Sequence, residues 1–307
     1  MMIDVTEQIG SQLAISLTDV SKSYKHFKLN SISLNYQRGM VAGLIGPNGA
    51  GKSTTMRIMM GLIQPDSGRV EVFGSEISSN LAASKQEIGY FSDDMRLYKP
   101  ETVGWHMQFI QSMYPSWDQH YANELVERFG LITDQTVKGL SHGQRVKAML
   151  LLILARKPKL LILDEPTNGL DPVAKHEVLQ ELMRVVEDPE RTILYSSHNT
   201  QDVEQICDWV TFIDRGRVIS SDNREKFLET WKRIKLTAPD NWMIPTIEGL
   251  RVESTFRSLK VLTHNQYTEA ALQQLRSSGA QIESVDAMSL EEIFINTVMR
   301  GREGVES

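Results

Sequence analysis

The chain has 307 residues, of which 41% are hydrophobic, enough to build one large domain and a second small one. Its formal net charge of −6 argues against a surface made for nucleic acid, so we expect no nucleic-acid partner. The single cysteine, Cys207, excludes an intrachain disulfide framework and is typical of a reducing compartment. The N-terminal residues lack a basic stretch followed by an apolar core, so we expect no signal peptide. The longest apolar run, residues 148–155, is far too short to span a bilayer.

The first seventy residues predict a β-rich start followed by a strand, a turn and a helix. Residues 12–36 alternate apolar and polar side chains in two runs, which indicates two antiparallel strands. Residues 40–45 predict a short apolar strand, and a glycine-rich turn then leads into a helix over residues 52–60. Gly61 is a suitable end for that helix, and residues 68–74 predict another strand.

The middle of the chain predicts helices followed by a β-α-β unit. Residues 101–131 are predicted to be helical. The segments 159–166 and 191–198 contain nearly continuous apolar runs, which are typical of parallel strands buried on both faces. A helix is predicted between them, over residues 173–187. Strand, helix and strand at this spacing indicate an α/β fold with a parallel sheet.

The pattern changes after about residue 230, where short strands and helices follow one another. We expect four strands and two helices in this part, with the strands at residues 233–239, 250–256, 259–264 and 281–288 and the helices at 267–279 and 289–300. Residues 230–307 are therefore predicted to form a small C-terminal α+β domain.

The segment GPNGAGKST fits the phosphate-binding pattern G-x-x-x-x-G-K-[ST] and has a predicted strand before it and a helix after it. In such a loop, backbone N–H groups and the helix N-terminus hold phosphates, the lysine reaches the β- and γ-phosphates, and the serine hydroxyl binds Mg²⁺. The alternative interpretation is a glycine-rich turn with a helix cap. The predicted nucleotide-binding residues here are Gly46, Pro47, Asn48, Gly49, Ala50, Gly51, Lys52, Ser53 and Thr54.

Two carboxylates follow the apolar run of residues 160–163. Asp164 ends this predicted buried strand, at the edge of the sheet where open α/β folds bind ligands. An acid at this position typically holds Mg²⁺, so Asp164 is a predicted metal ligand beside Ser53. Glu165 comes next and is the predicted general base for an attacking water molecule. A structural pair of acids at a strand end is the alternative.

The segments LSHGQ (140–144), DEPTNGLDP (164–172) and SSH (196–198), in this order, resemble the ATPase subunits of ABC transporters. The resemblance covers residues 12 to about 225. It implies a P-loop NTPase fold over residues 12–229, with a mixed β-sheet core, an antiparallel β subdomain and a helical subdomain at about residues 94–150. It also implies ATP and Mg²⁺ as cofactors.

The resemblance assigns roles to three more residues. Asp171 is expected in a loop that links the two ATP sites of a dimer. His198 is expected to touch the γ-phosphate and the attacking water, and the alternative is a strand-end histidine with a structural partner. Tyr24 is expected to stack on adenine, although an ordinary strand aromatic would fit the same pattern.

The segment LSHGQ also predicts a helix start. Ser141 and Gln144 have the spacing of a capping box before an apolar run. In the family the matching segment is LSGGQ, and it binds ATP held by the other subunit. Ser141, Gly143 and Gln144 are therefore predicted cofactor-binding residues, helped by the positive end of the helix dipole. His142 departs from the family pattern, and we expect the backbone role to survive.

A second departure occurs at Asp93. The family usually has glutamine there, in contact with Mg²⁺ and the nucleophilic water. Asp93 can still bind a metal through oxygen, so it is a predicted catalytic and metal-binding residue. The alternative is a solvated loop pair, Asp93 and Asp94.

The resemblance points to an ATP-hydrolysing subunit on the cytoplasmic face of the cell membrane. The helical segment between Asp93 and Ser141 is too short for the coiled coils of chromosome and repair ATPases. The tail of the chain, residues 289–300, resembles the C-terminal end of exporter-type subunits. We expect a homodimer, or a heterodimer with a related subunit, that powers a separate integral membrane permease, with export the favoured direction. The alternative is a soluble ABC ATPase that acts as a regulatory or assembly switch. The transported substrate is not encoded in this chain.

Overall fold

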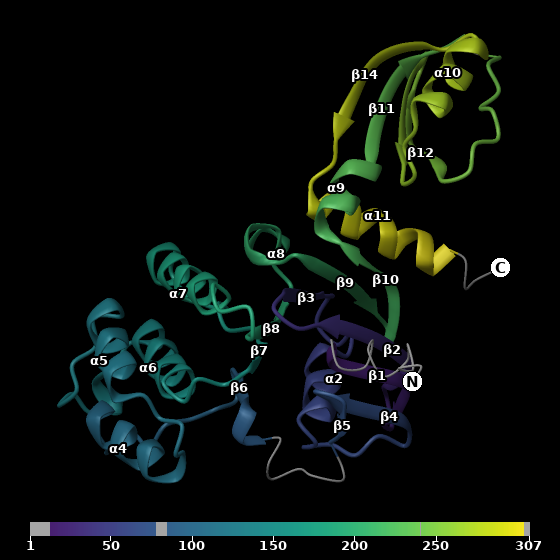
Figure 1. Cartoon of the computed structure of the whole chain (residues 1–307). Helices are drawn as coiled ribbons and strands as arrows, with labels where there is room; N and C mark the ends of the chain where they lie inside the picture. The colour runs from purple at the N-terminus through teal and green to yellow at the C-terminus, as the bar shows by residue number, and fades with distance from the viewer. Residues whose placement is uncertain (1–12, 78–84, 240, 304–307) are drawn as a thin grey trace, which may run out of the picture. The chain divides into compact units, whose positions relative to one another are not determined.

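The computed structural model describes residues 13–77, 85–239 and 241–303, and the predicted start of the first domain at residue 12 lies outside them. The chain divides into two compact units, residues 1–219 and 220–307 (Figure 1). Each unit has a hydrophobic core of its own. Whether the two units fold independently stays a prediction.

The first unit contains two sheets. The antiparallel sheet has the order β2-β1-β4-β5 and confirms the predicted pairing of the first two strands. Its strands are β1 (Leu13–Ser23), β2 (Lys28–Gln37), β4 (Ser67–Val72) and β5 (Ser75–Glu76). The second sheet has the order β10-β9-β3-β8-β7-β6. Its strands are β3 (Val41–Ile45), β6 (Ile88–Ser92), β7 (Leu160–Asp164), β8 (Thr192–Ser197), β9 (Trp209–Asp214) and β10 (Arg217–Asn223).

The centre of the second sheet is parallel, as its apolar strands predict. β6, β7, β8, β3 and β9 pair in parallel along this order. All residues of β3, β7 and β8 are buried, because helices and the antiparallel sheet cover this sheet and leave no polar face. Parallel strands end at the same edge of a sheet. The segments that follow β3, β7 and β8 therefore meet there, which is the place where open α/β sheets bind ligands.

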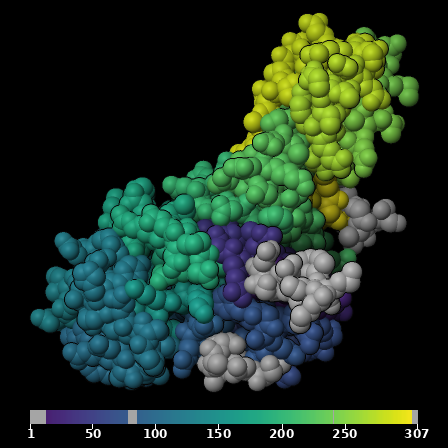
Figure 2. Space-filling view, viewed as in Figure 1, coloured from purple at the N-terminus to yellow at the C-terminus, as the bar shows by residue number. Residues whose placement is uncertain are grey.

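The helices of this unit fall into two groups. α2 (Lys52–Met59), α7 (Pro172–Val185) and α8 (Thr200–Ile206) follow strands of the central sheet. α4 (Val103–Met113), α5 (Gln119–Arg128) and α6 (His142–Leu154) form the predicted helical subdomain, which Figure 2 shows as a lobe in blue to teal. The predicted helical stretch 101–131 is in fact two helices. Pro115 follows the end of α4 and lacks the N–H group that a helix needs, and Asp118 caps the start of α5.

The second unit confirms the α+β prediction. Its sheet has the order β12-β13-β11-β14, with antiparallel pairing throughout. The strands are β11 (Lys232–Thr237), β12 (Leu250–Phe256), β13 (Leu259–His264) and β14 (Gln281–Ala287), and the helices are α9 (Arg224–Thr230), α10 (Glu269–Ser277) and α11 (Leu290–Glu303). Ile234, Leu236, Leu262 and Leu275 form its core. Arg300 of α11 lies over the Trp231 ring at 4.8 Å and donates to Thr263 of the sheet.

Candidate nucleotide site

The glycine-rich loop joins β3 to α2 and surrounds a pocket of about 380 Å³. Gly46 has no room for a side chain, because a Cβ atom there would lie 2.3 Å from the carbonyl oxygen of Ile213. Gly51 has a φ of 113°, a conformation that favours glycine. The loop residues that line the pocket are Pro47, Asn48, Gly49, Ala50, Gly51, Lys52, Ser53 and Thr54.

The start of α2 is suited to an anion. Its N-cap residue, Gly51, has no side chain that could accept from the first N–H groups of the helix. By contrast, α4, α5, α6 and α7 each begin with a side-chain cap. The uncapped N–H groups and the positive end of the helix dipole face a phosphate-sized ligand in this kind of loop. These features fit the phosphates of a nucleotide.

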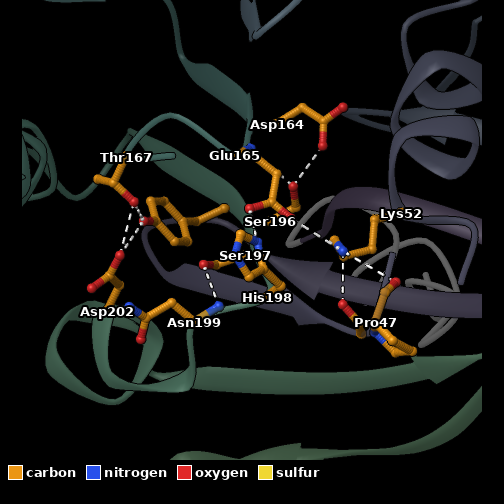
Figure 3. A network of polar contacts seen from close by, with 12 residues as sticks. Pro47, Lys52, Asp164, Glu165, Thr167, Ser196, Ser197, His198, Asn199 and Asp202 are labelled. Carbon is orange, nitrogen blue, oxygen red and sulfur yellow. Dashed lines mark hydrogen bonds and ion pairs between the residues drawn. The ribbon is translucent and has the colours of Figure 1, made fainter. Parts of the chain in front are cut away.

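Lys52 is the buried cation of the pocket. Only 5% of the residue is exposed, and Nζ donates to the carbonyl oxygen of Gly46 at 2.7 Å. Nζ also lies 3.1 Å from Oε1 of Glu165 (Figure 3). The lysine is therefore held over the loop with its charge directed towards the carboxylate that follows β7. A phosphate bound in the loop would meet the same ammonium group.

Asp164 ends β7, Glu165 follows it, and both are held by Ser196 of β8. Ser196 Oγ donates to Asp164 Oδ1 at 2.7 Å and accepts from the backbone N–H of Glu165 at 3.1 Å. Glu165 has a φ of 54°, in the left-handed region. For a residue other than glycine this costs about 1–3 kcal/mol and persists only where neighbouring contacts impose it. Such strain is often found at functional sites.

His198 completes the group, directly after β8. Its Nδ1 atom lies 2.7 Å from Oε2 of Glu165, so the carboxylate accepts from an Nδ1–H group on one side and pairs with Lys52 on the other (Figure 3). Lys52, Glu165 and His198 all line the pocket. The structure thus brings together the predicted phosphate-binding lysine, general base and histidine, which come from three separate segments of the chain.

Two residues that line the pocket were not predicted from the sequence. Phe27 and Asn168 both line the pocket. Tyr24, the predicted adenine platform, is 44% exposed and stacks on Phe27 with ring centroids 6.4 Å apart. Phe27 lies in the same short connection between β1 and β2, and its aromatic side chain was the available signal. Asn168 follows Glu165 by three residues, and its side chain type alone carries little information.

The signature segment forms the start of α6. Ser141 and Gln144 make both hydrogen bonds of the predicted capping box. His142 Nε2 lies 3.0 Å from the carbonyl oxygen of Asn168, a contact that the sequence did not indicate. A Cβ atom on Gly143 would contact Ala174 at 3.4 Å, so this helix start packs closely on α7. The roles of Ser141, Gly143 and Gln144 towards a second subunit stay predictions.

Asp171 caps α7 and accepts from the N–H groups of Val173 and Ala174. The bond from Ala174 lowers the pKa of this carboxyl below its usual value, although solvent surrounds it. The Asp171 side chain thus has a structural role as the N-cap of α7, which begins at Pro172. The expected role of Asp171 in linking two ATP sites concerns an assembly beyond this chain and stays a prediction.

Asp93 follows Ser92, which is the parallel partner of Asp164 in the sheet. It therefore comes from the same sheet edge, but it lines a second cavity of about 440 Å³, together with His142 and Arg145. Its neighbour Asp94 pairs with Arg57. Among the described residues, no three His, Cys, Asp or Glu side chains lie close enough to hold a metal by themselves. A metal here would need ligands from serine, water or phosphate, and the metal-binding roles of Ser53, Asp164 and Asp93 stay predictions.

A glycine-rich loop between a parallel strand and a helix, with a buried lysine over a pocket, is the geometry of P-loop nucleotide-binding proteins. The family described as "ABC transporter" matches residues 29–168. The ABC transporter ATP-binding protein YtrB of Bacillus subtilis (strain 168) is 32% identical over 208 residues, covering 68% of this chain and 71% of that protein. The lantibiotic transport ATP-binding protein SrtF of Streptococcus pyogenes is 36% identical over 208 residues, covering 67% and 89%. A solved ATP-binding subunit of an ABC transporter matches with a TM-score of 0.64 and 25% identity over 70% of this chain and 92% of that one.

The chain belongs to the family of ABC transporter ATP-binding proteins, and the predicted family and fold class are confirmed. Domains of this family bind ATP, and its members are the ATP-binding subunits of transporters. In the ranges that the structure describes, no helix is long and apolar enough to cross a membrane.

Proposed function

We propose that the chain hydrolyses ATP with Mg²⁺ in the pocket formed by the glycine-rich loop, and that two such subunits together power a membrane permease. The observation that carries the proposal is the chain of contacts from Lys52 through Glu165 to His198, all at the wall of one pocket. This group combines a cation for phosphate, a carboxylate base and a hydrogen-bonding histidine.

Binding is assigned to the loop and to α2. The N–H groups of the loop and the Lys52 ammonium would hold the β- and γ-phosphates. Ser53 and Asp164, with Asp93 from the neighbouring strand end, would hold Mg²⁺, which when bound would neutralise negative charge on the phosphates. Tyr24 and Phe27 supply aromatic faces on which the adenine ring can stack.

Hydrolysis is assigned to Glu165 and His198. The Glu165 carboxylate accepts the proton of the attacking water, whose oxygen bonds to the γ-phosphorus as the bond to the β-phosphate oxygen breaks. His198 donates to Glu165 through Nδ1, which fixes the carboxylate and leaves Nε2 as a second polar contact for the γ-phosphate or the water. ADP and inorganic phosphate are the products.

Dimerisation is assigned to the start of α6. The cap at Ser141 holds this helix end in an ordered conformation, and Gly143 lets the backbone approach a ligand. In a sandwich of two subunits, Ser141, Gly143 and Gln144 of one would meet the γ-phosphate bound by the other. Asp171 would lie in the loop between the two sites.

The partner is an integral membrane permease, with this chain at the cytoplasmic face of the membrane. Support comes from the relatives, which are transporter subunits, and from SrtF, whose name assigns it to lantibiotic transport. Export is the proposed direction, in line with the resemblance of residues 289–300 to the C-terminal end of exporter-type subunits.

The test measures mass by light scattering with and without ATP, in the slow variant Glu165→Gln. We expect a doubling of mass with ATP and none in Glu165→Gln combined with Ser141→Arg, which blocks the helix end. A second arm coexpresses the chain with a candidate membrane permease chosen from the genes that neighbour its own. If ATP does not change the mass, even with the permease present, the sandwich of two subunits is contradicted. If the chain does not co-purify with the permease, the regulatory alternative is favoured.

A further inference from the structure

The Glu165 loop is anchored on both sides of a strained residue. On one side, Ser196 holds Asp164 and the N–H group of Glu165. On the other side, Thr167 is only 5% exposed, and its hydroxyl points towards Asp202 of α8 (Figure 3). Because Glu165 has a left-handed φ of 54°, its conformation depends on such anchors.

Thr167 belongs to a buried polar network. Its Oγ1 atom donates to Asp202 Oδ2 at 2.8 Å and lies 2.7 Å from the hydroxyl of Tyr195. The Tyr195 hydroxyl also lies 3.4 Å from Asp202 Oδ2, so the three side chains contact one another. Lys175 Nζ reaches the other carboxylate oxygen of Asp202 at 2.9 Å. Asp202 is 4% exposed and Tyr195 is completely buried, so each polar group depends on the others for its hydrogen bonds.

The network joins the two segments that carry the reactive side chains. Thr167 lies two residues after Glu165, whereas Tyr195 and Asp202 lie three residues before and four residues after His198. Within the described part of the chain, none of these three side chains lines the nucleotide pocket. Burial and the nearby Asp202 charge raise the pKa of the Tyr195 hydroxyl far above its usual value, so it stays a donor at every working pH.

We propose that Thr167, Tyr195 and Asp202 are positioning residues that set the Glu165–His198 pair by fixing the loop after Glu165 to the segments around His198. The proposal rests on the proposed ATP hydrolysis at this pocket. It assigns these residues no contact with ATP. Their removal should therefore change turnover rather than nucleotide binding.

The kinetic test compares hydroxyl deletions of the same kind. Thr167→Val removes both bonds of Oγ1 at nearly constant shape, and Tyr195→Phe removes one hydroxyl. Tyr36→Phe is the matched control, because its buried hydroxyl also bonds a threonine, Thr211 at 3.0 Å, and is not part of the network. We expect Thr167→Val to lower kcat by about tenfold to a hundredfold, the size expected when reacting groups are misplaced. KM for ATP should stay within about twofold, and Tyr36→Phe should keep the kcat of the unmodified protein.

The second variant series tests whether the residues act together. Asp202→Asn should also lower kcat. The double variant with Thr167→Val should have the same kcat as Thr167→Val alone, since both changes remove the same Thr167–Asp202 contact. If Thr167→Val does not fold, Tyr195→Phe and Asp202→Asn decide by the same criterion. A normal kcat in the folded variants, with only thermal stability reduced, would overturn the proposal.

A measurement without turnover separates this inference from the proposed function. In protein labelled with ¹⁵N-histidine, the His198 ring signals are identified by their loss in His198→Ala. We expect Thr167→Val to shift the Nδ1 signal, which reports the bond to Glu165, and Tyr36→Phe to leave it in place. If the unmodified protein does not hydrolyse ATP, the proposed function fails, and the ring signals alone decide the inference. An unchanged Nδ1 signal in Thr167→Val would then overturn it.

Discussion

The ammonium group of Lys52 lies 3.1 Å from Oε1 of Glu165, and the other oxygen of this carboxylate accepts from His198. The proposed phosphate-binding cation and the proposed base are therefore direct partners. A phosphate bound in the loop would compete with Glu165 for Lys52. Nucleotide binding would therefore release the Glu165 carboxylate from its ion pair with Lys52.

Lys52→Ala tests the binding half of this account. Removing a charge-assisted phosphate contact should weaken ATP binding by at least about tenfold, the loss expected for about 1.4 kcal/mol or more. Isothermal titration measures the affinity. Lys22→Ala is the control, because Lys22 pairs with Asp66 on the antiparallel sheet and does not line the pocket. Equal ATP affinities of the two variants would contradict the assignment of the loop.

His142→Gly and His142→Gln test the contact between the signature segment and Asn168. This exposed hydrogen bond should contribute only about 0.5 kcal/mol, so His142→Gly should change the ATPase rate by about twofold at any pH from 6 to 8. Glutamine can still donate to the carbonyl oxygen and should restore the rate. A loss of more than about tenfold that is confined to low pH, where a free histidine is charged, would instead indicate that His142 holds phosphate.

Truncation tests the domain organisation. Residues 1–223 should fold and keep ATP binding, because every proposed ATP contact lies upstream and the second unit has its own core. A chain ending at Thr230 should be less soluble, since it keeps α9 and the buried Phe227 without the helix that packs on it, α11. Circular dichroism and gel filtration compare the two. An unfolded 1–223 fragment would show that the C-terminal unit belongs to the main core.

Glu292→Gln tests the acid response of the C-terminal unit. Hydrogen bonds from Arg233 and then from Ser289 lower the pKa of Glu292 below its ordinary 4.5. A lowered pKa in the folded state adds stability above the ordinary pKa, and this stability is lost as the pH falls through the lowered value. Glu292→Gln should therefore reduce the melting temperature at pH 7, and the difference should shrink as the pH falls below the ordinary pKa of 4.5. The exposed neighbour variant Glu291→Gln is the control, and a pH-independent difference would contradict the charge-based account.

Local patterns in the sequence were enough to predict the phosphate loop and the α6 cap. Both features depend on residues only a few positions apart, which lie close together in space because they are neighbours in the chain. The break after α4 was also readable, because Pro115 cannot continue a helix, yet it was passed over in the long helical stretch 101–131. The strand β9 was missed because its six residues, Trp209–Asp214, mix apolar and polar types.

Contacts between distant segments could not be predicted from spacing. The bond from Thr167 to Asp202 joins residues 35 positions apart, and neither residue type identifies its partner. The sequence predicted Lys52 and Glu165 for the same site, but it did not predict their direct contact. The left-handed backbone at Glu165 has no signature in the residue type, since it is imposed by Ser196 and by the packing of the loop.

The most direct test of the central claim compares ATP binding and phosphate release by the unmodified protein and Glu165→Gln, with Glu177→Gln as a control carboxylate of α7. Glutamine keeps the shape but can neither accept the proton nor neutralise Lys52. We expect Glu165→Gln to bind ATP at least as tightly as the unmodified protein and to release phosphate at least about a hundredfold more slowly, as expected for the loss of a general base. Glu177→Gln should keep the normal rate. Phosphate release by Glu165→Gln at the rate of the unmodified protein would contradict the assignment of Glu165 as the base.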